Sequence, residues 1–235
     1  MIIHCIWEHN GDDSLLYAVE PIGAYARGEN LDTALKKMPG EVASYYKWRG
    51  QAVPGCLKIS VAGKKASTLT IRDADSDVLL PSEIPLLTAD EYEMLKALAL
   101  DSARDFLALY ESIPDKDAAA APPRQTFYGP VPRTAREMYE HTKNVNTYYF
   151  GEIGVEADNN GSIYECRQHG FALLETSPDF LQNKLYHGSY NEDWTLRKVL
   201  RRFIWHDRIH ARAMWRTATA LWGSREIENP FFFIQ

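Results

Sequence analysis

The sequence lacks the marks of several large protein classes. It has 3 cysteines among 235 residues, far apart and without CxxC spacing, which argues against a disulfide framework and a thiolate zinc site. No uncharged apolar run approaches the ~20 residues needed to cross a bilayer. The first residues, MIIHCIWEHNGDD, offer neither a basic leader nor a small-residue cleavage site. We therefore expect a cytoplasmic protein with no membrane partner.

An excess of positive charge is missing as well. The 26 Lys and Arg are outnumbered by 32 Asp and Glu, for a formal net charge of -6, and neither half of the chain is basic. We therefore expect no nucleic acid among its partners. Glycine-rich phosphate loops, GxSxG elbows and paired-cysteine sites are also absent. What the chain does have is 45% hydrophobic and 25% charged residues, the usage of an ordinary globular protein.

Residues 1–85 have the pattern of a small α/β domain. Short stretches rich in β-forming residues predict strands at 2–7, 15–19 and 22–26. Helical spacing of apolar residues then predicts a helix at 31–46, with a kink or break at Pro39-Gly40. Alternating apolar residues around a turn at Gly63-Lys64-Lys65 predict a second hairpin. An acidic, turn-rich stretch ends at Pro85, where we place the domain boundary.

Residues 86–235 predict long amphipathic helices. The apolar stripes and capping residues place them at about 88–113, 134–151, 162–176 and 193–222, with Asp193 as the N-cap of the last. The stretch 115–132 holds four consecutive alanines and four prolines, so it is a connection. Four such helices, joined partly by long connections, describe a four-helix bundle. The predicted fold class is therefore α+β, a small α/β domain followed by an all-α bundle.

Three of the seven histidines stand where an apolar residue is expected. His141 interrupts the core stripe of the second predicted helix, and His206 and His210 interrupt that of the fourth. Because His206 and His210 are four residues apart, both imidazoles leave the same side of the helix. A third imidazole from a facing helix would complete a three-His metal site with an open position for water or substrate. The alternative is three neutral core histidines, each with its own buried hydrogen-bond partner.

Several other polar residues near the three histidines could have either a functional or a purely structural role. Glu137 lies one turn before His141 and either orients it or is a solvated helix charge. Tyr148 and Tyr149 either line a pocket or pack in the bundle. Asp207 is expected to pair with a neighbouring arginine, and His169 to be structural. The arginines of the last helix are expected to form a solvated face; they are Arg197, Arg201, Arg208, Arg212 and Arg216.

The helical part resembles the DinB-like superfamily of bacterial four-helix-bundle proteins. The resemblance lies in TAREMYEHTKNVNTYYFGEI and WTLRKVLRRFIWHDRIHARAMWR, and it covers about residues 86–235. The superfamily includes YfiT-type metal-dependent hydrolases and thiol-dependent S-transferases. Its hallmark is one histidine from the second helix and an H-x3-H pair from the fourth, which bind a divalent metal such as zinc or nickel. His141, His206 and His210 match that pattern.

The resemblance implies a function for the bundle. Its members with assigned chemistry use the metal to activate water or a low-molecular-weight thiol against a small electrophile. We therefore expect a metal-dependent hydrolase or thiol S-transferase acting on a small molecule, with no catalytic base that we can assign from the sequence. The alternative is a non-catalytic stress-response or regulatory protein whose metal site is vacant or structural.

The first part has a fainter resemblance. A strand pair followed by GAYARGENLDTALKKMPGEVASYY is similar to the HicB-like fold of antitoxins and accessory domains. No helix-turn-helix segment accompanies it, so we expect an interaction or dimerisation domain. A homodimer is expected on a second ground, because DinB-like bundles frequently dimerise. The apolar tail Phe231-Phe232-Phe233-Ile234 also needs a surface to pack against.

Overall fold

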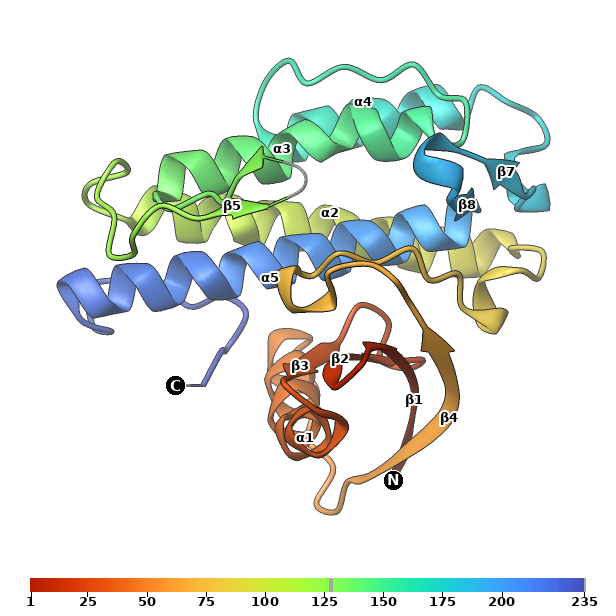
Figure 1. The fold of residues 1–235 in the computed structure, drawn as a ribbon. Helices are drawn as coiled ribbons and strands as arrows, with labels where there is room; N and C mark the ends of the chain where they lie inside the picture. Colours follow the sequence, from red (N-terminus) through yellow and green to blue (C-terminus); the bar gives the residue numbers. More distant parts are fainter. Residues whose placement is uncertain (127–128, 235) are drawn as a thin grey trace. The chain divides into compact units, whose positions relative to one another are not determined.

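A computed structural model describes residues 1–126 and 129–234 of the protein. Residues 127 and 128 of the predicted connection, and the last residue of the chain, lie outside the described part. The chain divides into two compact units, and the first consists of Met1–Ser82 together with the C-terminal segment from Phe231. The second is Glu83–Pro230. The first unit contains a four-stranded sheet and the second is mostly helical, so the α+β class is confirmed (Figure 1).

The sheet of the first unit has the strand order β3-β2-β1-β4. Strands β1 (Ile2–Asn10), β2 (Asp13–Ala18) and β3 (Tyr25–Gly28) are successive antiparallel neighbours. Helix α1 (Leu31–Trp48) then crosses over to β4 (Lys58–Ala66), which pairs parallel with β1. A helical crossover of this kind is what a parallel pair of strands requires.

Two details of the first unit differ from the prediction. The second hairpin is wrong, because β4 continues through Gly63-Lys64-Lys65 and follows β1 along its length, with a register shift opposite Cys5 and Ile6. Of the kink or break expected at Pro39-Gly40, the break does not occur, since α1 includes Pro39 and continues on both sides of it. Long-range pairing and packing have outweighed local turn and breaker signals in both cases.

The apolar C-terminal tail packs within the first unit. Phe231 is fully buried, its ring lies 5.4 Å from that of Trp48, and its carbonyl accepts a hydrogen bond of 2.8 Å from the Ser44 hydroxyl of α1. Phe233 stacks on Phe231 with ring centroids 5.4 Å apart. The tail therefore completes the core of the first unit instead of belonging to the predicted domain 86–235, and it needs no second copy of the chain to cover these two rings.

The second unit is built on four long helices. They are α2 (Ala89–Ser112), α3 (Ala135–Gly151), α4 (Ile163–Leu174) and α5 (Leu196–Trp222). Helices α2 and α3 each pack against both α4 and α5 (Figure 1). The core between these helices is rich in aromatic rings. Capping boxes start α2, α3 and α4 at Thr88, Thr134 and Ser162. None of the described helices combines the length and the apolarity that a membrane crossing demands.

Two short hairpins lie in the connections of the second unit. Strands β5 (Gln125–Thr126) and β6 (Gly129–Pro130) pair between α2 and α3, and β7 (Tyr186–His187) and β8 (Asp193–Trp194) pair between α4 and α5. The second hairpin corrects one prediction. Because Asp193 is part of β8, the N-cap of α5 lies two residues later, at Thr195, whose side chain accepts from the Lys198 backbone N–H.

The arginines of α5 do not form the solvated face that the sequence predicted. Arg201 and Arg208 are at most 1% exposed, although Arg216 is exposed. The guanidinium of Arg201 pairs with the buried carboxylate of Glu83. Asp207 pairs with an arginine, as predicted, but the partner is Arg167 of α4 inside the core and not a neighbour in the sequence. The amphipathic pattern was misleading here, since a buried arginine with a carboxylate partner looks like a surface residue in the sequence.

Candidate metal centre

Helices α3 and α5 pack against each other and bring three imidazoles together. The ring centroid of His141, on α3, lies 5.1 Å from that of His206 and 4.6 Å from that of His210. The His206 and His210 rings, one turn apart on α5, are 4.4 Å from each other. One ring nitrogen from each residue lies within 4.8 Å of the other two, so the three histidines can hold a metal ion.

The cluster lies at the edge of the helical core and not deep inside it. His206 is buried, with 7% of its surface exposed, whereas His210 is half-buried and His141 is exposed. Because the cluster is open on the His141 side, a small molecule can reach it from solvent. This is the arrangement expected of a reactive metal site, in which one coordination position stays free for water or substrate.

The donor set fits a divalent transition metal. Burial lowers the pKa of His206 well below its ordinary value. Although part of the His141 side chain is exposed, the neighbouring atoms of the protein shield its ring from water and lower its pKa too. Both effects favour the neutral imidazole, which is the form that binds metals. The His206 Nδ1 atom is buried and has no hydrogen-bond partner among the described residues, a cost of about 1–3 kcal/mol that a bound group can remove.

The ligand atoms need only small movements to reach the spacing of a loaded site. Bonds of ~2.0–2.1 Å in tetrahedral geometry place two ligand nitrogens about 3.4 Å apart. The nitrogens of the cluster all lie within 4.8 Å of one another, so binding a metal shortens the distance between any two of them by at most about 1.4 Å. Side-chain rotations suffice for a movement of this size.

A polar and aromatic region follows the cluster along the α3–α5 contact. Tyr149 is buried, and its ring lies 5.9 Å from that of His206. It also contacts Trp194 of β8 at 5.5 Å between ring centroids. The guanidinium of Arg202 lies 5.4 Å from the centre of the Tyr149 ring. The sequence reasoning missed Arg202 and Lys198, although Lys198, Arg202, His206 and His210 recur at intervals of four and so share one side of α5.

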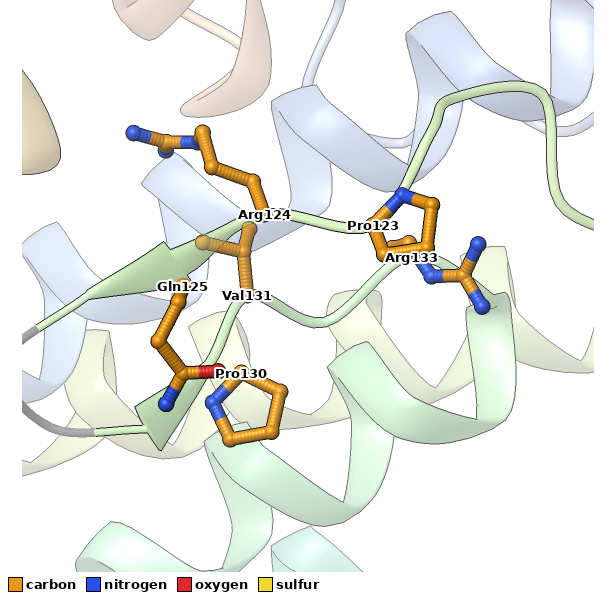
Figure 2. A pocket seen from close by; sticks show the side chains of 6 residues that line it. All are labelled: Pro123, Arg124, Gln125, Pro130, Val131 and Arg133. Carbon is orange, nitrogen blue, oxygen red and sulfur yellow. The ribbon is translucent and has the colours of Figure 1, made fainter.

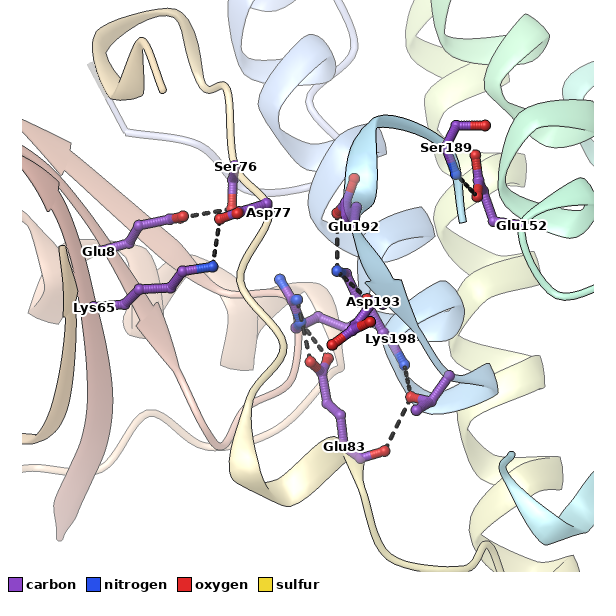
Figure 3. Close-up of polar contacts among 12 residues, drawn as sticks. Glu8, Lys65, Ser76, Asp77, Glu83, Glu152, Ser189, Glu192, Asp193 and Lys198 are labelled. Carbon is purple, nitrogen blue, oxygen red and sulfur yellow. Dashed lines mark hydrogen bonds and ion pairs between the residues drawn. The ribbon is translucent and has the colours of Figure 1, made fainter. Parts of the chain in front are cut away.

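Two carboxylates tie the β7–β8 hairpin to the ends of α3 and α5 (Figure 3). The Ser189 N–H donates to Glu152 Oε2 at 2.8 Å. The ammonium of Lys198 lies 2.8 Å from a carboxylate oxygen of Glu192 and donates to the Asp193 carbonyl at 2.6 Å. These contacts hold the hairpin, including Trp194, against the region next to the cluster.

The remaining sequence candidates have structural roles. Glu137 neither orients His141 nor is simply solvated, because its carboxylate accepts from the backbone N–H groups of Arg133 and Thr134 at the start of α3. His169 is exposed, and its Nδ1 atom lies 3.7 Å from Oδ2 of Asp158. Its predicted structural role is therefore limited to a contact at the surface. Tyr148 packs against Trp194 with 5.8 Å between ring centroids.

A surface hollow in the connection between α2 and α3 is separate from the cluster. It has a volume of about 220 Å³ and is lined by Pro123, Arg124, Gln125, Pro130, Val131 and Arg133. In Figure 2 the side chains of Arg124 and Arg133 point away from each other, so they do not converge on one ligand. None of the three histidines lines the hollow, and we assign it no function.

Comparison with known proteins gives no independent guide to the site. No protein-family model, no curated protein and no solved structure matches this chain. The case for a function depends on the residues of the cluster and on their geometry.

Proposed function

We propose that the second unit is a DinB-like four-helix bundle and that the chain is a divalent-metal-dependent enzyme acting on a small molecule. The reaction type that we propose is hydrolysis or thiol S-transfer. The observation that carries the proposal is the convergence of His141, His206 and His210, whose ligand nitrogens lie within 4.8 Å of one another. The order of the helices supports it too, since one histidine comes from the second helix of the unit and an H-x3-H pair from the fourth.

Zinc or nickel is the metal that we propose. Imidazole nitrogen is a favourable ligand for both, and no thiolate or carboxylate belongs to the cluster in the described part of the chain. A divalent ion at this position would lower the pKa of a bound water or thiol, so that the nucleophilic anion is available near neutral pH.

Each residue of the cluster would have its own role in binding the ion. His206 and His210 hold the ion from α5, and their positions are fixed by one helical turn. His141 completes the site from α3, at the exposed edge where the substrate enters. The buried ring of Tyr149 packs beside His206 and limits its rotation. The lowered pKa values of His206 and His141 reduce the proton loss that metal binding would require.

Metal analysis tests this function most directly. Protein purified without a histidine tag is expected to contain, or to take up on titration, about one equivalent of zinc or nickel per chain. His206→Ala should lose this metal and remain folded, because apolar packing around the helices is unchanged. His169→Ala removes an exposed histidine outside the cluster and serves as the matched control, which should keep the metal.

The outcomes separate the two candidate classes. If less than about a tenth of an equivalent of any divalent metal binds, the enzyme proposal fails and a regulatory protein with a vacant site takes its place. If His206→Ala loses its helical circular dichroism together with the metal, the ion has a structural role. Retention of full metal binding by His206→Ala would show that the ion sits elsewhere.

A further inference from the structure

We propose that the outer edge of strand β4 is a docking site for an extended, acidic segment of a partner protein, which adds to the sheet of the first unit as a fifth strand. By the outer edge we mean the backbone groups of β4 that point away from β1. This inference goes beyond the proposed function, since it involves neither the histidine cluster nor a metal.

Strand β4 forms one edge of the sheet, and its pairing with β1 fixes which of its backbone groups are used (Figure 1). The backbone N–H of Lys58 donates to the Met1 carbonyl at 3.0 Å. That of Ser67, directly after the strand, donates to the His9 carbonyl at 2.8 Å. Because successive strand residues point their N–H and C=O groups to opposite edges, the residues with outward groups are Ile59, Val61, Lys64 and Ala66. Within the described part of the first unit, these outward groups have no hydrogen-bond partner.

The two edges of this sheet differ in length and in cover. The other edge is β3, which has 4 residues and packs against α1, and Lys37 of that helix donates to the Arg27 carbonyl at 2.9 Å. Strand β4 has 9 residues and alternates between exposed and half-buried positions, with Val61 38% exposed. A long, uncovered edge of this kind offers a row of N–H and C=O groups to another extended chain.

The charge of β4 selects the kind of segment that fits. The strand carries three lysines and no acidic residue. Lys65 is paired with Asp77 at 2.5 Å. Lys58 and Lys64 are exposed, and within the described part of the first unit neither has an ion pair. Opposite charges on facing residues of neighbouring strands attract, so the edge favours a segment that carries Asp or Glu.

A second copy of the chain is a poorer occupant of this edge. Antiparallel pairing of two β4 strands about Val61 would set Lys58 of one copy opposite Lys64 of the other, and these like charges repel. It would also bring two irregular stretches together, because β4 has an extra residue, Ala62, where its register with β1 shifts. Lysines and bulges at an edge are features that hinder self-association. A short acidic segment avoids both obstacles, since it can pair on one side of the bulge.

Labelled peptides test the inference on the full chain. The probe is a short peptide of alternating valine and glutamate with a fluorophore at its N-terminus, and fluorescence anisotropy measures its binding. It is expected to bind at least about 10-fold more tightly than the same peptide with lysine in place of glutamate. A version that is methylated at every backbone nitrogen should bind at least about 10-fold more weakly, because it cannot donate hydrogen bonds to the edge.

Variants of β4 locate the binding edge. Val61→Pro removes an outward N–H and no bond to β1, so it should lower the affinity for the acidic peptide at least about 10-fold. Val61→Thr keeps the N–H and the branched side chain, and it should bind like the original protein. If Val61→Pro does not fold, Lys64→Glu decides, since it should weaken binding of the acidic peptide. Lys36→Glu, at an exposed position of α1, is its matched control and should not.

Three results overturn the inference. The first is equal affinity for the glutamate and lysine peptides. The second is an unchanged affinity for the glutamate peptide in folded Val61→Pro or Lys64→Glu. The third is a dimer of the full chain that Val61→Pro separates in analytical ultracentrifugation, because the edge would then hold a second copy. None of these measurements involves a metal, so the proposed function stands or fails separately.

Discussion

At the scale of single residues, several charged side chains of α5 are buried, although the helical periodicity of the sequence predicts that they face solvent. Lys198, Arg201 and Arg208 are each at most 1% exposed, although they recur along α5 at intervals typical of a solvated face. Such groups are tolerated because carboxylates accompany them, as Glu192 does Lys198 and Glu83 does Arg201. Among these residues, Lys198 makes the unit sensitive to pH.

Lys198 predicts a rise in stability under alkaline conditions. Burial lowers its pKa from 10.5 to about 8, although the charge of Glu192 opposes the shift. Between these two values the unfolded chain binds more protons than the folded chain, so the free energy of unfolding increases with pH, by up to about 3 kcal/mol. Below pH 8 the side chain is protonated in both states and this contribution is constant. Urea unfolding at pH 7.5, 8.5 and 9.5 measures the effect.

A variant that lacks only the Lys198 ammonium isolates that contribution. Lys198→Met should lack the rise between pH 8 and 10, whatever its stability at neutral pH. Lys184→Met removes an exposed lysine from the same unit and should retain the rise. Equal slopes for the original protein and Lys198→Met would show that other groups cause the pH dependence.

At the scale of elements, the close approach of α3 and α4 depends on a glycine. A Cβ built on Gly170 of α4 would lie 2.1 Å from Cε2 of Phe150 on α3, a contact that real side chains do not make. Phe150 is fully buried and packs on Phe171 and Phe203, so it has no room to withdraw. The helices must separate if a methyl group is added.

Gly170→Ala is therefore expected to destabilise the second unit by about 1–3 kcal/mol through overpacking. Gly151→Ala is the matched control, since its Cβ would meet nothing within 4 Å at the end of α3. Alanine favours a helix over glycine by up to about 1 kcal/mol, so the control should be neutral or slightly stabilising. Thermal unfolding of the two variants gives the comparison, and similar melting temperatures would contradict the proposed clash.

At the scale of the whole molecule, the chain enters the first unit twice. Residues from both ends build that unit, because the segment from Phe231 joins Met1–Ser82. Phe231 contributes a fully buried ring against Trp48 of α1, and Ser44 fixes the backbone beside it. The first unit is therefore incomplete until the last residues of the chain are in place.

Phe231→Ala should weaken the first unit by about 3–5 kcal/mol, the usual cost of emptying a buried aromatic site. Phe232→Ala is the control, because this neighbouring ring is 48% exposed and its loss should cost little. Hydrogen exchange at the α1 amides, read by mass spectrometry, reports on the first unit separately. Equal protection in the two variants would show that the tail is dispensable.

The sequence by itself determined the helices of the second unit and the three histidines. Capping residues at Thr88, Thr134 and Ser162 and stripes of apolar residues are local signals, and the structure confirms these helix starts. The interval between His206 and His210 fixes their common direction because both belong to one helix. Local geometry needs no knowledge of the rest of the chain.

Only the tertiary structure decided the partners that lie far away in the sequence. The parallel pairing of β4 with β1, the ion pairs of Arg201 and Asp207 and the rings around Arg202 each join segments that no local pattern connects. The meeting of His141 with the α5 pair also required α3 and α5 to pack side by side. Such contacts depend on the packing of the whole core. The role of a polar residue in an apolar stripe can be assigned only when its partner is known.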